Sequence, residues 1–218
     1  MDDIKAYLSP TEVIDSDHPE IVQYAFKRAG DAKNNTSKAC ALFAAVRDEI
    51  AYNPMTDFHR QSHYQASNVL KNKTGYCVSK ACLLIALGRA VGIPSRLGLA
   101  DIRNHGASQD IVDLMGTNVF TYHGFAEFFL DGRWVKATPA FDGPVYEKHN
   151  IPLVEFDGRQ DAVFPSHDLS GNLYVEYIKY HGTFVDLPLK DLMQSFRKIY
   201  SNERVDLWIE MMESERQS

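Results

Sequence analysis

The sequence has little of what marks several large classes of protein. It contains only three cysteines, Cys40, Cys77 and Cys82, and their spacing matches no metal-binding cluster. An odd number of cysteines without such spacing is typical of reduced thiols. No apolar stretch reaches the roughly 18 residues of a membrane span. Residues 1–20 lack the basic start and the apolar core of a secretion signal. We therefore expect a cytoplasmic protein with no membrane partner.

A basic surface is also missing. The formal net charge is -6, and no run of lysine or arginine offsets it. Nucleic-acid-binding domains carry basic patches, so we expect no nucleic-acid partner. Internal repeats and low-complexity segments are absent too, which favours a single domain over residues 1–218. The hydrophobic content of 44% is enough to bury a proper core.

Helical spacing of apolar residues is clear in several stretches. It predicts amphipathic helices over residues 19–29, 37–50 and 191–212. The stretch 77–91 is apolar on nearly every side and is followed by Gly92, which is typical of a buried helix that ends in a glycine cap. The stretch around 173–182 is compatible with either a strand or a short helix.

Strand signals gather in the middle of the chain. Residues 96–100 read as one strand, and 119–130 and 133–138 read as two more. The last two are joined by Asp131-Gly132, a strong short-range hairpin signal.

The hairpin register places several polar residues near His123. If Asp131-Gly132 is the whole turn, continuing the ladder sets His123 opposite Ala140. The diagonal neighbours of His123 are then Thr138 and Asp142, at about 7–8 Å.

Cys77 is the candidate nucleophile because it stands at the predicted start of a helix. The helix dipole is expected to lower the pKa of its thiol, and the free N–H groups there can bind an oxyanion. A cysteine nucleophile needs a base, and His123 is the candidate. The alternative is a buried structural thiol and a structural histidine. His59 and His63 have metal-ligand spacing for a helix, but no third ligand is evident, so we expect no metal and no cofactor.

These segments resemble the transglutaminase-like superfamily. GYCVSKACLLIALGRAVGIPSR is similar to its cysteine motif, and HGFAEFFLDGRWVKATPAF to its histidine hairpin. VRDEIAYN is similar to the helix and tyrosine that precede the cysteine motif. The resemblance implies an α+β, papain-like fold, in which N-terminal helices and the cysteine-bearing helix pack on an antiparallel sheet. We expect the core over about 37–142 and a C-terminal extension over 143–218.

The resemblance also assigns roles. Cys77 matches the nucleophile and His123 the base. The family's third position is an Asp four residues after the tryptophan, but Thr138 stands there in WVKATP. We therefore expect Asp142 to orient His123, with Thr138 or a backbone carbonyl as the alternative. No side chain is assigned to the oxyanion, although Gln65 is available.

The implied activity is acyl transfer from an amide through a Cys77 thioester. Hydrolysis of a peptide or protein substrate is the expected reaction, as in a cysteine peptidase or amidase. One alternative is transfer to an amine, as in a transglutaminase, and another is a non-catalytic binding module. The oligomeric state and the substrate are left open.

Overall fold

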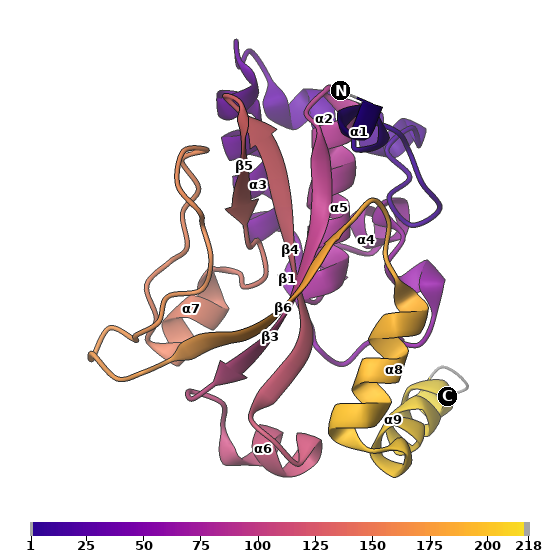
Figure 1. Ribbon diagram of the computed structural model, residues 1–218, viewed down its shortest axis with the longest axis vertical. Coiled ribbons are helices and arrows are strands. Elements are labelled where there is room, and N and C mark those ends of the chain that lie inside the picture. The colour runs from indigo at the N-terminus through magenta and orange to yellow at the C-terminus, as the bar shows by residue number, and fades with distance from the viewer. Residues whose placement is uncertain (1, 216–218) are drawn as a thin grey trace.

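The structure, a computed structural model, describes residues 2–215 of the chain and the side chains of residues 4–214. Four antiparallel strands form the main sheet in the order β5-β4-β3-β6, and β1 and β2 form a separate parallel pair (Figure 1). None of the described helices is long and apolar enough to cross a bilayer. The elements are α1 (Asp2–Ala6), α2 (Pro19–Ala29), α3 (Asn35–Glu49), β1 (Ala51–Tyr52), η1 (Gln61–His63), α4 (Ala66–Asn72), β2 (Thr74–Gly75), α5 (Cys77–Ala90), β3 (Ser95–Asn104), α6 (Gln109–Met115), β4 (Val119–Leu130), β5 (Arg133–Ala137), α7 (Gly143–His149), β6 (Val175–Phe184), α8 (Leu189–Tyr200) and α9 (Asn202–Glu215).

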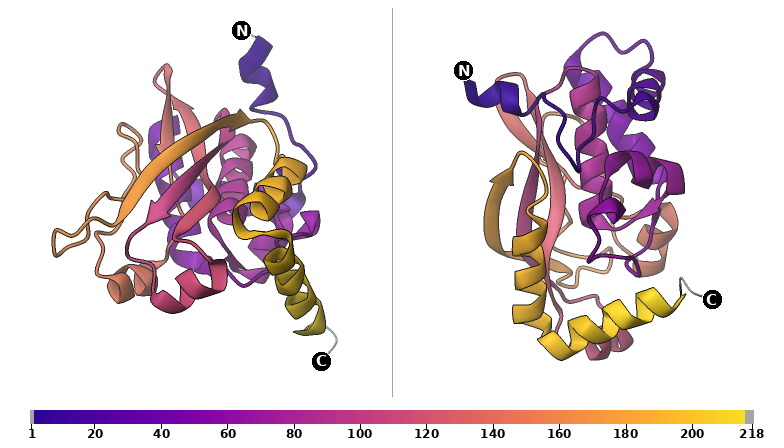
Figure 2. Two further views of the ribbon diagram at one scale, coloured as in Figure 1. Left: turned by 60° about the horizontal axis from the view of Figure 1, so that its bottom comes forward. Right: turned by 90° about the vertical axis from the view of Figure 1, so that its right-hand side faces the viewer.

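Helix α5 lies at the centre of the molecule. One side of it packs on β3 and β4, and its other sides pack on α2, α3 and α4. These helices lie on one side of the sheet (Figure 2). Every residue from Val78 to Arg89 is buried, because a helix that is apolar all round can be enclosed on all sides. Even Lys80 is enclosed, with its Nζ donating to the Ile50 carbonyl at 2.6 Å, and burial lowers the pKa of this amine to about 7.

The predicted hairpin forms, but it is shorter than the register implied. The turn residues Asp131 and Gly132 have φ of 48° and 83°, which suits the right-handed twist of the strands. Pairing runs from Leu130–Arg133 to Ala126–Ala137 and stops there.

The chain leaves the hairpin at Thr138. The Thr138 amide donates to the Ala162 carbonyl at 2.8 Å, and Pro139 has no amide to offer β4. The expected pairing of His123 with Ala140 is therefore wrong, because a segment far along the chain takes the place of β4.

The residues after 142 complete the sheet. Strand β6 pairs antiparallel with β3 along its whole length, so the ambiguous stretch near 173–182 is a strand. The helix predicted over 191–212 is instead two helices, broken at Ser201, where φ is 76°. The break lets Trp208 fold back on Tyr200, with ring centroids 5.4 Å apart.

Helix α5 approaches the backbone of the sheet closely at Gly124. A Cβ on this residue would lie 2.7 Å from the Cα of Val78, which is backbone and cannot swing aside. We therefore expect Gly124→Ala to lower the free energy of unfolding by roughly 1–3 kcal/mol in urea titrations. Gly143→Ala is the matched control, because a Cβ there meets nothing within 4 Å, and its effect should stay within about 0.5 kcal/mol. Equal effects of the two substitutions would contradict this account of the contact.

Candidate active site

Cys77 is the first residue of α5, as the sequence predicted. The chain turns into the helix at Tyr76, whose amide donates to the Ser79 hydroxyl at 2.9 Å. Gly75 leaves room for that hydroxyl, because a Cβ there would lie 2.5 Å from it. The Cys77 sulfur is approached by its own amide and by the amides of Val78 and Gly124. The side chain is only partly buried, whereas Cys82 is fully buried inside the same helix.

The electrostatics of this thiol differ from the expectation. Burial raises the pKa of Cys77 to about 11, although the three surrounding amides lower it. The free-energy cost of removing the Cys77 thiolate from water is larger here than the stabilisation that the helix N-terminus provides. The expected lowering of the pKa is therefore wrong for the free protein, in which Cys77 is a neutral thiol at pH 7.

His123 lies in β4 with its ring among aromatic side chains. Its ring centroid is 4.9 Å from that of Phe164 and 6.0 Å from that of Tyr177. The residue is 3% exposed, and burial lowers the pKa of the imidazole to about 3. Its Nε2 is buried and has no hydrogen-bond partner among residues 4–214. His123 is thus a neutral base at pH 7 with one ring nitrogen unpaired.

The Cys77 sulfur lies at the Gly124 amide, the residue after His123, where β5 leaves β4. The Phe129 amide donates to Pro94 on the β3 side at 2.9 Å, so alternate amides of β4, including that of Gly124, point toward β5. The ladder with β5 ends at Ala126, which leaves the Gly124 amide free for the Cys77 sulfur. The fold therefore carries the thiol to the residue that directly follows His123.

Asp142 has a different role from the one expected. Its Oδ1 accepts the Val145 amide at 3.2 Å and caps α7, and its Oδ2 accepts the Tyr52 amide at 2.8 Å. No hydrogen bond joins this carboxylate to His123 within the described part of the chain. The prediction depended on a hairpin register that stops at Ala137, so the structure does not support Asp142 as the residue that orients the imidazole.

Thr138 occupies the third position beside the site. It is fully buried, and among the residues whose side chains are described its Oγ1 makes no hydrogen bond of good geometry, although the Tyr177 hydroxyl lies close to it. The hydroxyl of Tyr177 lies next to it and accepts the Phe164 amide at 3.3 Å. A buried hydroxyl without a partner costs about 1–3 kcal/mol, and such groups gather at functional sites. Thr138 and His123 are two of them, and Tyr177 contacts both.

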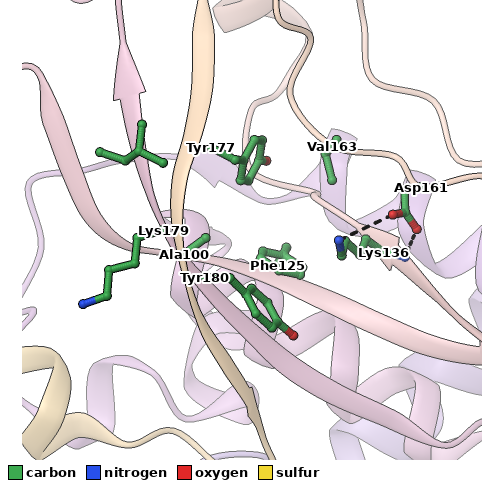
Figure 3. A pocket seen from close by; sticks show the side chains of 9 residues that line it. Ala100, Phe125, Lys136, Asp161, Val163, Tyr177, Lys179 and Tyr180 are labelled. Atoms are coloured by element: carbon green, nitrogen blue, oxygen red, sulfur yellow. Dashed lines mark hydrogen bonds and ion pairs between the residues drawn. The ribbon is translucent and has the colours of Figure 1, made fainter.

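An open groove (Figure 3) lies on the face of the sheet away from α5, because Phe125 lines it whereas its neighbour Gly124 lies against Val78. It has a volume of about 530 Å³. Tyr177 and Phe125 line it and also lie against the His123 ring. Lys136 points into it and pairs with Asp161 at 3.6 Å. The groove thus offers aromatic walls and one ion pair beside the candidate base.

The remaining candidates lie elsewhere or have other partners. Gln65 precedes α4, and its Oε1 accepts the Asn68 amide group at 3.0 Å. His59 pairs with Glu213 at 3.5 Å. Within residues 4–214, no three His, Cys, Asp or Glu side chains are close enough to hold a metal ion.

Sequence reasoning missed the aromatic residues from distant segments, above all Tyr52 and Tyr177. The tyrosine in VRDEIAYN was visible as part of a motif, but its nearness to Cys77 was not. Tyr177 lies in the stretch around 173–182, which the sequence left undecided between a strand and a short helix. The direction of its side chain could therefore not be predicted.

Comparison with known families shows to which superfamily the chain belongs. A model of the transglutaminase-like superfamily matches residues 22–139, more than half of the chain. The chain belongs to the transglutaminase-like superfamily. The resemblance found in the motifs is thereby confirmed, as is the α+β fold. Cys77, His123 and Thr138 lie inside the matched region, and Asp142 lies outside it.

One solved structure shares the fold of this chain. A candidate cysteine protease from Cytophaga hutchinsonii superposes with a TM-score of 0.51 at 19% identity, over 84% of this chain and 54% of its own. This chain thus spans about half the length of that protein. A candidate protease from Parabacteroides distasonis gives a TM-score of 0.43 at 17% identity, over 62% of this chain and 26% of its own. No curated protein matches the chain.

The raised pKa of Cys77 predicts slow alkylation near neutral pH. We expect the rate of iodoacetamide labelling of Cys77, followed by peptide mass spectrometry, to keep rising up to about pH 11. An ordinary exposed thiol would level off above about 8.5. A rate that is already at its plateau at pH 7 would show a thiolate–imidazolium pair in the free protein and contradict this picture.

The lowered pKa of His123 predicts a loss of stability in acid. The unfolded chain takes up the proton near pH 6.5, whereas the folded imidazole does so only near 3, so the free energy of unfolding falls as pH drops between these values. The slope is about 1.4 kcal/mol per pH unit, or about 2 kcal/mol between pH 6.5 and 5. In urea titrations His123→Gln should remove this part of the decline. The exposed His167→Gln should retain it; if both variants behave alike, the imidazole of His123 is not buried as described.

Proposed function

We propose that this protein hydrolyses an amide or peptide bond through a thioester on Cys77. The observation that carries the proposal is that the Cys77 thiol at the start of α5 lies at the Gly124 amide, directly after His123, at the point where β5 leaves β4. A nucleophilic sulfur, a neutral base and several backbone amides are the groups that such chemistry needs. Membership of the transglutaminase-like superfamily and the likeness to a candidate cysteine protease support it.

In the proposed reaction His123 first accepts a proton from the Cys77 thiol and then donates it to the leaving amine. The Cys77 sulfur attacks the amide carbon while His123 takes the thiol proton, because both groups are neutral before the substrate binds. The carbonyl oxygen becomes an oxyanion beside the amides at the start of α5. His123 then gives its proton to the leaving amine as the C–N bond breaks, which leaves a thioester. Water, deprotonated by His123, attacks the thioester and releases the acid and the thiol.

The groove next to His123 lies on the opposite face of the sheet from α5, so we infer that it holds the part of a peptide that extends away from the bond attacked by Cys77. Its walls combine the rings of Phe125, Tyr177 and Tyr180 with the charged groups of Lys136 and Asp161.

A second candidate function is a binding module that retains the fold without turnover. The specific observation in its favour is that no carboxylate among residues 4–214 bonds to the imidazole, since Thr138 stands in the position of the family's Asp. A threonine hydroxyl can accept the imidazole N–H but cannot stabilise an imidazolium as a carboxylate does. The two proposals differ in whether Cys77 forms a covalent intermediate.

Replacing the nucleophile distinguishes these functions. We expect cleavage of a mixed peptide library, followed by mass spectrometry, to disappear in Cys77→Ala and to persist in Cys40→Ala, whose thiol lies in α3. Adding a primary amine to the assay separates hydrolysis from amine transfer, because transfer would leave the amine on the product. Cleavage that survives in Cys77→Ala would end the enzymatic proposal, and a wild-type protein without any cleavage would favour the binding module.

Restoring the family's carboxylate should activate the site. In Thr138→Asp a negative charge next to the imidazole is expected to raise the pKa of His123 and stabilise the ion pair with Cys77. Labelling of Cys77 by iodoacetamide at pH 7 should then be at least about tenfold faster than in the wild type. Thr138→Ser, which keeps the hydroxyl, should label at the wild-type rate. Equal rates in a folded Thr138→Asp variant, checked by near-UV circular dichroism, would refute the role given to position 138.

A further inference from the structure

Asp101 lies in β3, between the strand that carries His123 and the edge strand β6 (Figure 1). The pairing of β3 is irregular beside it on both sides. On the β4 side two residues, Thr121 and Tyr122, oppose the single residue Asp101. On the β6 side His181 is an extra residue that the pairing with β3 skips. Such bulges are common next to active sites, where they redirect side chains.

The bulge in β4 determines which face of the sheet His123 occupies. His123 is paired with Ala100, which lines the groove. A regular ladder that continued from the pair of Ile102 and Phe120 would set Tyr122 opposite Ala100 instead. Because side chains alternate along a strand, this slip by one residue would turn the imidazole to the α5 face. The direction of the candidate base therefore depends on the bulge.

The bulge has unfavourable local geometry that another group must offset. Tyr122 has a φ of 56°, in the left-handed region that residues with a side chain rarely adopt. Its amide lies outside the regular ladder and needs an acceptor elsewhere. Asp101 supplies that acceptor, because its Oδ1 accepts the Tyr122 amide at 3.1 Å and the Thr121 hydroxyl at 2.6 Å.

The same oxygen of Asp101 also holds the extra residue of β6. His181 Nε2 donates to Oδ1 at 2.7 Å, and the His181 ring centroid is 4.3 Å from that of Tyr122. Although burial raises the pKa of Asp101, these hydrogen bonds lower it by more, so the group is a carboxylate at pH 7. Hydrogen bonds to a carboxylate are stronger than those to a neutral acceptor. One buried side chain thus joins the bulges of both neighbouring strands.

Helix α8 adds two contacts to the same segment of β4. The Tyr200 hydroxyl accepts the Thr121 amide at 2.9 Å. The Ser195 hydroxyl donates to Thr121 Oγ1 at 2.7 Å, because the Thr121 proton is already given to Asp101. The bulge is therefore held by a network that extends from Asp101 to α8.

We propose that Asp101 positions His123, because its carboxylate holds the bulge that turns the imidazole away from α5. Asp101 acts through the backbone of β4 and touches no reacting atom, so it is a positioning residue. Its effect on turnover rests on the proposed function, in which His123 is the base. The place of the imidazole does not, and it can be measured without a substrate.

The test compares two substitutions of Asp101. Asp101→Ala removes the acceptor of all three donors, and we expect kcat for peptide cleavage to fall by roughly 10–100-fold with KM changed less than about threefold. Asp101→Asn keeps an oxygen acceptor in the same place and should retain kcat within about threefold. Equal losses in the two variants, or more than half of kcat in Asp101→Ala, would contradict the inference.

Asp15→Ala is the matched control. Asp15 is 9% exposed and Asp101 8%, and the Asp15 Oδ1 likewise accepts a backbone amide, that of Ser67 at 3.1 Å, but Asp15 lies outside the sheet. Its substitution should lower the free energy of unfolding and leave kcat within about threefold. A fall in kcat as large as that of Asp101→Ala would mean that lost stability alone explains the effect.

The position of the imidazole gives a second readout by NMR. In the wild type the ring protons of His123 should show nuclear Overhauser contacts to the Phe164 ring, whose centroid is 4.9 Å away. We expect these contacts to be lost in Asp101→Ala and kept in Asp101→Asn and Asp15→Ala. Contacts that persist in a folded Asp101→Ala overturn the inference, whatever its activity.

A milder variant covers the case in which Asp101→Ala does not fold. Thr121→Val keeps the shape of the side chain and removes one of the three donors to Asp101. We expect weaker contacts between His123 and Phe164 and a kcat lowered at least about threefold. Wild-type contacts together with wild-type kcat would overturn the inference.

The outcomes separate this inference from the proposed function. If Cys77→Ala is inactive while Asp101→Ala retains more than half of kcat, the inference fails and the hydrolase proposal stands. If Cys77→Ala is as active as wild type, the hydrolase proposal fails, and the ring contacts of His123 still decide the role of Asp101.

Discussion

The contact between α5 and β4 at Gly124 determines how the rest of the site is arranged. Because position 124 has no side chain, the Val78 backbone at the start of α5 can lie against the strand. The same approach brings the Cys77 sulfur to the Gly124 amide, one residue from the imidazole of His123. A helix held further from the sheet would carry its first residue away from the strand. The positions of Cys77 and His123 thus depend on one backbone-to-backbone approach that the packing of α5 on all sides maintains.

Burial, more than the helix dipole, sets the charge state of the site. The thiol pKa rises to about 11 and the imidazole pKa falls to about 3, although backbone amides surround the sulfur. The third position is also uncharged, because Thr138 carries a hydroxyl where the family has a carboxylate. The site therefore has no formal charge on any of these side chains at neutral pH. The nearby carboxylate of Asp142 is bound to two backbone amides and serves the placement of Tyr52.

Local patterns in the sequence predicted the parts of the site that depend on neighbours along the chain. The glycine before Cys77, the apolar helix after it and the turn at Asp131-Gly132 are short-range signals, and each is confirmed. The register failed beyond Ala137 because Ala162, from a loop with no periodic pattern, takes the next backbone bond.

The remaining errors share a cause in tertiary structure. The direction of the thiol pKa could not be read from the helix alone, because it depends on how much of the fold encloses the sulfur. Tyr52 and Tyr177 approach the site through pairings between distant segments, which carry no signal in a single sequence. The sequence identified the motif residues, but it did not identify the residues that surround them in the fold.

The pairing of β6 with β3 has a consequence for the order of events during synthesis. Strand β3 lies inside the sheet, so one of its edges remains unpaired until the residues of β6 have left the ribosome. Before that moment, a nascent chain that already contains the cysteine and histidine motifs presents an open strand to any neighbour, the usual starting point for mispairing. The family-matched segment, residues 22–139, therefore lacks the strand that pairs with the outer edge of β3 in the complete sheet.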